Sequence, residues 1–249
     1  MRSTMLRRAD PLRMVLALGL ALLLSGCGQT AITPADPVIE PEPPLCAVEP
    51  EPSAYTTATL AVCGDVMTHL PLTNDAWDEE QQRYDFLRIM EAARPWIERA
   101  DYAVANLETT MSGGPPYSGY PAFNAPDDLA YDLKEIGFDL MLTANNHSLD
   151  CGWSGVQRTL DVLDKAGLAH VGTGRTQEEA DNGIVVADVG GISVAFLGYT
   201  YGTNGIPLPK AAPFAVNVYN IDYLTHLAQP DYDRLEADLD KAAALNTDL

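Results

Sequence analysis

Residues 58–249 are predicted to form one α/β domain. Short apolar runs rich in β-branched residues alternate there with segments of helical periodicity, and this alternation is typical of a sheet covered by helices. Two helical segments begin with proline and acidic residues, and two end at a glycine, as helices in folded proteins often do. A segment of this length also suffices to enclose a substantial core.

Two strands and a helix are expected in the first part of the domain. The run TLAVCG (59–64) predicts a strand that ends in a glycine turn, and DYAVAN (101–106) predicts a second strand. Between them, YDFLRIMEAARPWIERA (84–100) has helical periodicity. Pro95 is expected to break or restart this helix, because proline has no N–H to donate within a helix.

A helix, a third strand and a second long helix are expected next. PDDLAYDLKEIG (126–137) predicts a helix that starts at proline and acidic residues and ends at glycine. FDLMLTA (138–144) predicts the strand. GWSGVQRTLDVLDKAG (152–167) predicts the second helix, because its apolar residues repeat at helical spacing and Lys165 and Gly167 suit a helix C-terminus.

A hairpin and a final helix complete the expected elements. NGIVVADVGGISVAFLGYT (182–200) predicts two strands that turn at Gly190 and Gly191. PDYDRLEADLDKAAALN (230–246) predicts a helix that is opened by proline and an aspartate. The tripeptide TDL that follows resembles the start of another strand, so we expect the sequence to be a fragment of a longer chain.

Polar side chains gather directly after three of the predicted strands. Because the carboxyl ends of parallel strands meet at one edge of a sheet, we expect these side chains to form a single site. Carboxylate and amide oxygens together with imidazole suit a divalent cation of the manganese, iron or zinc kind, whereas calcium more commonly takes oxygens alone. The residues are Asp65 and His69 after the first strand, Asn106 and Glu108 after the second, and Asn145, Asn146, His147 and Asp150 after the third.

Most of these residues also have a purely structural interpretation. Asp65 could accept backbone hydrogen bonds in a turn, Glu108 could be a solvated loop acid, and His69 is expected to be an ordinary loop histidine. Asp150 lies just ahead of a predicted helix, where a carboxylate typically caps free N–H groups. His147 is harder to explain in this way, because an imidazole held by a neighbouring carboxylate is prepared for proton transfer.

Three motifs resemble, in order and spacing, the CapA family of capsule and poly-γ-glutamate synthesis proteins. They are GDVM (64–67), NLE (106–108) and ANNHSLDCGWSGVQRTLDVLDKAGLAHVGTG (144–174). The resemblance extends from about residue 58 to the end of the chain. It implies a metallophosphoesterase-like α/β/β/α sandwich, incomplete at its C-terminus, with a site for two divalent metal ions.

The resemblance also implies roles for individual residues. Asp65, Glu108 and Asn146 would be ligands of the metal ions, with Glu108 at or between them. His147 would be the acid or the transition-state donor. Independently of the resemblance, the position of Asp150 close to His147 indicates that its carboxylate steadies the ring. The family pattern continues with a histidine-tryptophan-glycine and a histidine-proline-histidine motif. This sequence contains neither motif, so we again expect a fragment of a longer gene product; a truncated form that cannot hold two metal ions tightly is the alternative.

The same resemblance predicts a function at the cell surface in capsule or poly-γ-glutamate biosynthesis. The chain would be a metal-dependent hydrolase or transferase, and the alternative is a non-catalytic assembly or export partner of a membrane polymer synthase. A net charge of −20 argues against nucleic acid as a partner, because no basic cluster is available to neutralise phosphates. Direct binding of an anionic exopolymer would equally need bound cations or a local basic pocket.

The first part of the chain is expected to lie outside the domain. Residues 1–26 combine a basic start with an apolar run too short to span a bilayer comfortably, which is typical of an export signal. The run ends in LSGC (24–27), which resembles a bacterial lipobox and implies that lipid on Cys27 anchors the chain to the extracytoplasmic face of a bacterial membrane. An ordinary secretory signal with a stray cysteine is the alternative. Residues 27–57 are rich in proline and glutamate and are expected to form an extended tether.

Three cysteines remain after Cys27. Cys46, Cys63 and Cys151 do not form the even set that a disulfide framework requires. We expect small buried thiols, and a bridge between Cys63 and Cys151 is the alternative.

Overall fold

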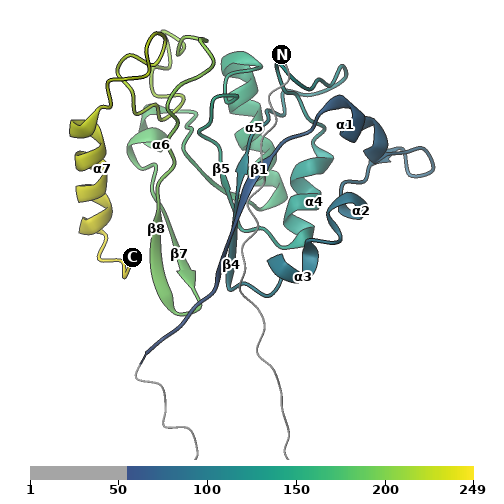
Figure 1. Ribbon diagram of the computed structural model, residues 1–249, viewed down its shortest axis with the longest axis horizontal. Helices are drawn as coiled ribbons and strands as arrows, with labels where there is room; N and C mark the ends of the chain where they lie inside the picture. The colour runs from purple at the N-terminus through teal and green to yellow at the C-terminus, as the bar shows by residue number, and fades with distance from the viewer. Residues whose placement is uncertain (1–54) are drawn as a thin grey trace, which may run out of the picture. The chain divides into compact units, whose positions relative to one another are not determined.

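The computed structural model describes residues 55–249 (Figure 1). The expected export signal (1–26), the lipidation site Cys27 and the thiol of Cys46 therefore lie outside the described residues, as does most of the expected tether (27–57). Within residues 55–249, no helix has both the length and the apolar character needed to cross a membrane.

A parallel sheet of four strands lies at the centre of the domain, in the order β1-β4-β5-β6 (Figure 1). The three strands that were expected to precede the polar clusters are confirmed as β1, β4 and β5. The glycine turn expected at the end of the first strand is wrong, because β1 continues through Gly64 and pairs with β4 up to Val66. The bounds are Leu60–Val66 for β1, Tyr102–Leu107 for β4, Leu140–Leu142 for β5 and Ala169–Val171 for β6.

Strand β1 is irregular just before its polar end. Val62 pairs with Val104 of β4, but the next aligned pair is Asp65 with Asn106, so β1 has one residue more than its neighbour in this stretch. Such a bulge bends a strand and changes the direction of the side chains that follow it. Asp65 is the first aligned residue after the bulge.

Helices cover one face of the sheet. α4 (Asp128–Ile136) and α5 (Gly152–Ala166) both end where the sequence predicts, because Gly137 and Gly167 adopt left-handed φ angles of 114° and 75°. Their apolar sides pack against the sheet in the main core, which contains the fully buried residues Leu133, Ile136, Met141, Leu160 and Leu163.

The helix predicted over residues 84–100 begins later than expected and is divided. It consists of α2 (Leu87–Met90) and α3 (Arg94–Ile97), and Pro95 lies in the first turn of α3, as expected of a proline that restarts a helix. Tyr84 belongs instead to strand β3 (Arg83–Tyr84), which pairs with β2 (Trp77–Asp78).

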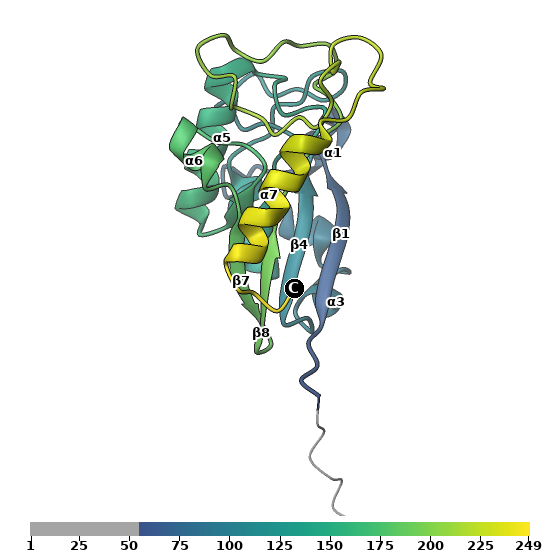
Figure 2. The same ribbon diagram turned by 90° about the vertical axis from the view of Figure 1, so that its left-hand side faces the viewer.

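A hairpin covers the other face of the sheet. Its strands β7 (Val185–Val189) and β8 (Ile192–Phe196) are antiparallel, and they turn at the two predicted glycines, which both have positive φ angles. Phe196 stacks on Tyr102 of β4, with 5.5 Å between the ring centroids. Helix α7 (Tyr232–Ala244) lies along the outer side of this hairpin (Figures 1 and 2). The layers thus follow the predicted α/β/β/α order.

Two helices were not predicted. α1 (Leu70–Ala76) follows β1, and α6 (Gln177–Asp181) follows β6. After α7, the N–H groups of Asp248 and Leu249 both donate to the carbonyl of Ser193 in β8, although residues 247–249 do not form a regular strand.

Cys63 and Cys151 are free thiols. The alternative of a disulfide bridge between them is therefore wrong. Both side chains are only partly buried, and burial raises the pKa of the Cys63 thiol.

Candidate functional site

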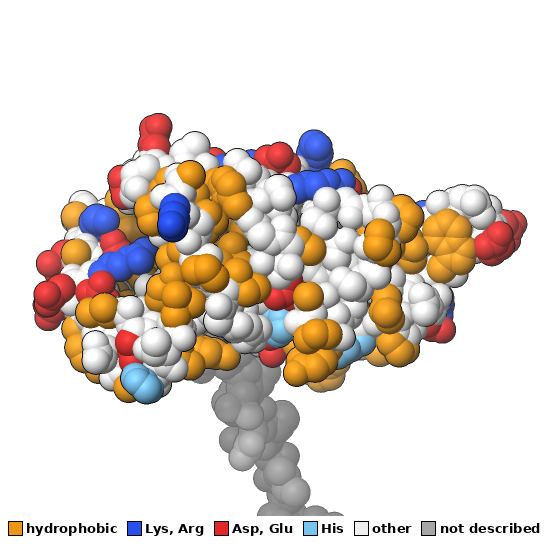
Figure 3. All heavy atoms as spheres, turned by 90° about the horizontal axis from the view of Figure 1, so that it is seen from above, with side chains coloured by type: hydrophobic (Ala, Val, Ile, Leu, Met, Phe, Trp, Pro, Cys, Tyr) orange, Lys and Arg blue, Asp and Glu red, His pale blue; other side chains and the backbone are white. Residues whose placement is uncertain are grey.

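The loops after β1, β4 and β5 meet at the carboxyl ends of these strands. Asp65 of β1 pairs with Asn106 of β4, and Asn106 pairs with Leu142 of β5. The register therefore brings the three predicted polar clusters to one edge of the sheet. Viewed from above this edge, histidine and acidic side chains adjoin near the middle of the face, among hydrophobic and neutral atoms (Figure 3).

The side-chain amide of Asn106 lies between two carboxylates, those of Asp65 and Glu108. The Nδ2 group of Asn106 donates to Oδ1 of Asp65 at 2.8 Å and lies 3.4 Å from Oε2 of Glu108. Glu108 is buried, whereas Asp65 is exposed. Burial, together with the nearby carboxylate of Asp65, raises the pKa of Glu108. Two like charges are thus held close together at the end of the sheet.

Asn145 connects this pair to the loop that contains His147. Its Nδ2 group donates to Oδ1 of Asn106 at 3.2 Å and to the carbonyl of Leu107 at 2.8 Å. Its Oδ1 accepts the backbone N–H of His147 at 3.0 Å. Asn145 therefore fixes the position of the His147 backbone relative to strand β4.

His147 and Asp150 form a buried pair. Nδ1 of His147 lies 2.7 Å from Oδ2 of Asp150, and only 8% and 2% of their side chains are exposed. On the other side of the ring, Nε2 lies 3.7 Å from Oε1 of Glu108. Phe123 packs edge-on against the imidazole, with 4.8 Å between ring centroids. Burial raises the pKa of Asp150, although its bonds from the Phe123 N–H and from His147 oppose this change.

The expectation that Asp150 caps the following helix is wrong. The N-cap position of α5 is Cys151, which makes no side-chain cap bond. The carboxylate of Asp150 instead accepts the N–H of Phe123 at 2.6 Å and contacts His147. The chain segment around Phe123 comes from a distant loop, so local sequence could not reveal this use of the carboxylate.

Asn146 separates two hollows in the surface. The first, of about 520 Å³, is lined by Asp65, Asn106 and Glu108. The second, of about 470 Å³, is lined by His147 and Asp150. Asn146 lines both hollows, so every residue to which the sequence assigned a metal or catalytic role borders one of them. Their roles as ligands and catalytic groups remain predictions.

Phe123 and Asn204 contribute to the site but were not named from the sequence. His69, which was grouped with the site residues but interpreted as an ordinary loop histidine, packs edge-on against Phe123, with 5.1 Å between ring centroids. Phe123 in turn supports His147 and Asp150. Asn204 lies against the His147 ring from a loop after β8. The Asn-Gly pair at 204–205 was the available signal for this last residue, since it is typical of a tight turn.

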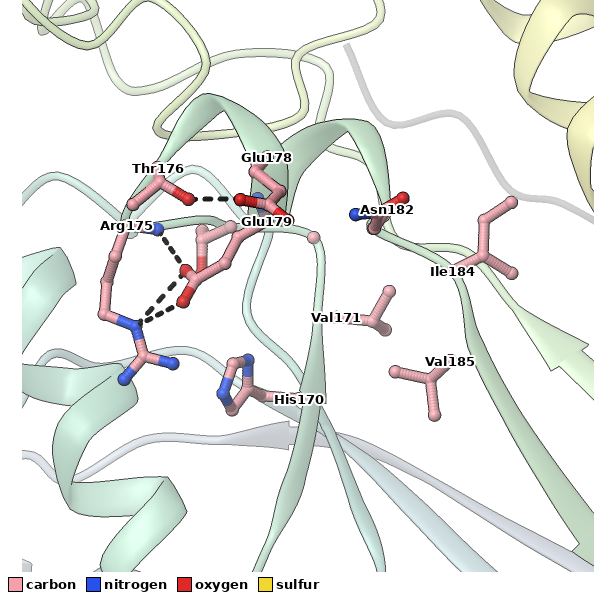
Figure 4. A pocket seen from close by; sticks show the side chains of 12 residues that line it. His170, Val171, Arg175, Thr176, Glu178, Glu179, Asn182, Ile184 and Val185 are labelled. Carbon is pink, nitrogen blue, oxygen red and sulfur yellow. Dashed lines mark hydrogen bonds and ion pairs between the residues drawn. The ribbon is translucent and has the colours of Figure 1, made fainter.

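A separate pocket of about 440 Å³ lies beside β6 and α6 (Figure 4). Arg175 borders it, but its guanidinium group already binds Asp161, Asp164 and Glu179. This cation is therefore neutralised by the protein itself. None of the predicted site residues lines this pocket.

The donors at the candidate site suit a hard divalent cation. Asp65 and Glu108 offer carboxylate oxygens in the same hollow as the amide of Asn146, and a cation there would offset the repulsion between the two acids. In the described part of the chain, no group of three or more histidine, cysteine, aspartate or glutamate side chains is placed to hold an ion. Amide oxygens and water would therefore complete the coordination shell of one ion, and a second ion stays a prediction.

The sequence of this domain is similar to sequences of known proteins. The family described as "Bacterial capsule synthesis protein PGA_cap" matches residues 59–249. The capsule biosynthesis protein CapA of Bacillus anthracis is 28% identical over 147 residues, which are 57% of this chain and 34% of that protein. The PGA biosynthesis protein CapA of Bacillus subtilis (strain 168) is 28% identical over 115 residues, which are 45% of this chain and 30% of that protein.

An uncharacterized protein of Sinorhizobium fredii, y4sH, is 33% identical over 130 residues, which are 49% of this chain and 26% of that protein. The matched region thus spans about a third or less of the length of these curated relatives.

Proposed function

The chain belongs to the bacterial capsule synthesis protein PGA_cap family, and from this membership we propose that it takes part in the biosynthesis of a capsule or poly-γ-glutamate exopolymer. Within that process it acts as a metal-dependent hydrolase or transferase on a phosphoester-like bond. The supporting observation is the buried pair of His147 and Asp150 beside the carboxylate of Glu108.

The contact between His147 and Asp150 supports a direction for proton transfer. Asp150 accepts a hydrogen bond from the Nδ1–H group of His147, so Nε2 would be the ring atom that exchanges a proton with the substrate. Protonation of the departing oxygen by a positioned imidazole typically accelerates such a reaction by about 10²–10⁴-fold. A divalent ion held by Asp65, Glu108 and Asn146 would supply an activated water and neutralise phosphoryl charge.

One observation favours the alternative of a non-catalytic assembly or export partner of a membrane polymer synthase. No lysine or arginine is among the residues that line the two hollows. An anionic polymer would therefore meet acidic and neutral side chains there, unless bound cations intervene.

The test compares two histidine variants of the chain. His147→Ala should lower the metal-stimulated hydrolysis of a phosphodiester, such as bis-p-nitrophenyl phosphate, by about 10²-fold or more. His170→Ala is the matched control, because His170 also contacts a carboxylate, that of Asp164, but outside the site. Equal activity of the two variants, with capsule production intact in cells that contain His147→Ala, would favour the assembly role.

The cellular location follows from the N-terminal sequence. The proposal is that the chain is exported and then anchored through lipid on Cys27 to the extracytoplasmic face of a bacterial membrane. This location suits a protein that handles a polymer outside the cytoplasm.

A further inference from the structure

Asn204 occupies a fixed turn above the candidate site. It has a positive φ angle of 50°, and Gly205 after it has one of 79°. Two positive φ angles in succession define a tight turn of the type that Asn-Gly prefers. The N–H of Ile206 donates to the carbonyl of Thr203 at 2.9 Å, and the fully buried Thr203 hydroxyl donates to the carbonyl of Ile206. The backbone of Asn204 is therefore held from both sides.

The Asn204 side chain contacts two of the predicted site residues at once. Its Nδ2 lies 3.4 Å from Nε2 and 3.5 Å from Nδ1 of His147. Its Oδ1 accepts a hydrogen bond from Nδ2 of Asn146 at 3.3 Å. These distances are long for hydrogen bonds, so the contacts are weak and act mainly by restricting the orientation of the two side chains.

The contacts of Asn204 leave one functional atom of each neighbour open. Asp150 holds Nδ1 of His147, and Nδ2 of Asn204, almost equally far from both ring nitrogens, lies against the ring and not along the in-plane lone pair of Nε2. The Oδ1 atom of Asn204 is then free to accept from Nδ2 of Asn146. Because its Nδ2 is used in this way, Asn146 keeps its Oδ1 available to the hollow that contains the two carboxylates.

We propose that Asn204 is a positioning residue that fixes both the ring of His147 and the amide of Asn146. The consequence of this inference rests on the proposed function: the side-chain amide oxygen of Asn146 would be available to a cation, and Nε2 of His147 would be available to the substrate. Removal of a residue that orients a metal ligand without binding the metal itself typically lowers metal affinity or activity by about 10–100-fold.

The test uses Asn204→Gly, because glycine adopts positive φ angles without strain and the turn should persist. Asn246→Gly is the matched control, since Asn246 has a φ angle of 53° and lies outside the site, just after α7. In the cation-free protein, ¹⁵N NMR should show the His147 ring N–H and the Asn146 side-chain amide broadened or shifted in Asn204→Gly alone. Unchanged signals in both variants would overturn the proposal.

Cation binding and kinetics extend the same comparison. Mn²⁺ alone should bind about 10–100-fold more weakly to Asn204→Gly, and kcat should fall with little change in KM. Asn204→Asp keeps an acceptor for Asn146 but has no N–H for His147, so it should recover Mn²⁺ binding without recovering kcat. Equal Mn²⁺ affinity of Asn204→Gly and the parent chain would overturn the proposal. A parent chain with neither Mn²⁺ binding nor hydrolysis would refute the proposed function, while the NMR comparison would still decide the role of Asn204.

Discussion

At the scale of single residues, the candidate site combines the buried carboxylates of Glu108 and Asp150 with the buried imidazole of His147. Asp150 orients His147 through Nδ1, while Glu108 lies near Nε2 on the opposite side of the ring. Asn145 fixes the backbone between them by bonding to strand β4. Each of these groups is held before any substrate binds, which is the arrangement that reduces the cost of reaching a reactive geometry.

The raised pKa of Glu108 predicts a pH-dependent effect on stability. Because the folded protein favours the protonated acid, the cost of ionising Glu108 is absent below its ordinary pKa and grows as pH rises through the raised value. With a chelator present, Glu108→Gln should therefore be more stable than the parent chain at neutral pH, by on the order of 1 kcal/mol. The difference should vanish in acid.

Urea unfolding across pH measures this difference. The exposed Glu236 of α7 provides the control, and Glu236→Gln should follow the parent chain at every pH. Addition of Mn²⁺ should make the parent chain more stable than Glu108→Gln, because the ionised carboxylate of Glu108 would then bind the cation in the folded state. A parent chain that remains the more stable at neutral pH without cation would contradict the assigned cause.

At the scale of elements, strand ends and short loops determine where the site residues lie. The bulge in β1 precedes Asp65, and the end of β6 approaches the loop that begins at Ala144. This second contact is close because Gly172 has no side chain. A Cβ atom at position 172 would lie 2.6 Å from Cβ and 2.8 Å from N of Ala144.

Gly172→Ala should therefore disturb both stability and the site. Gly172 has a φ angle of 110°, so the variant meets backbone strain as well as the clash, and a loss on the order of 3 kcal/mol is expected. Gly167→Ala is the control, because its φ angle of 75° also disfavours alanine but no atom lies within 4 Å of the added Cβ. It should lose about 1 kcal/mol. Equal losses in thermal or urea unfolding would show that the approach to Ala144 does not matter.

At the scale of the whole molecule, two layers of strands lie between two layers of helices. The central sheet buries one face under α4 and α5 and the other under the β7–β8 hairpin. The loops at one end of this arrangement are left to form the site. The chain is also strongly acidic, with 35 aspartate and glutamate residues against 15 lysine and arginine residues, which favours solubility over binding of polyanions.

The N-terminal sequence predicts that Cys27 carries covalently attached lipid. Cells supplied with labelled palmitate should incorporate the label into the parent chain, and Cys27→Ser should lose both the label and the association with membranes. Cys46→Ser is the matched control, because Cys46 lies in the proline- and glutamate-rich segment and not in the lipobox-like motif. Equal labelling of Cys27→Ser and the parent chain would leave an ordinary secretory signal as the explanation.

The sequence alone was sufficient for features that depend on neighbouring residues. The ends of α4 and α5 follow from Gly137 and Gly167, because a left-handed residue after the last turn is a local requirement. The turn between β7 and β8 follows from two glycines for the same reason. The grouping of Asp65, Glu108 and His147 was also predictable, since parallel strands present their carboxyl ends at one edge.

Only the tertiary structure decided the features that depend on distant contacts. Tyr84 joins a strand because Trp77 is available to pair with it, although its own neighbours favour a helix. Asp150 does not cap α5, because its carboxylate instead binds the N–H of Phe123 and the ring of His147. Asn204 approaches His147 from a loop 57 positions further along the chain. Local pattern sets the conformation of a segment, whereas packing selects which distant donor meets each buried acceptor, because unpaired polar groups are costly to bury.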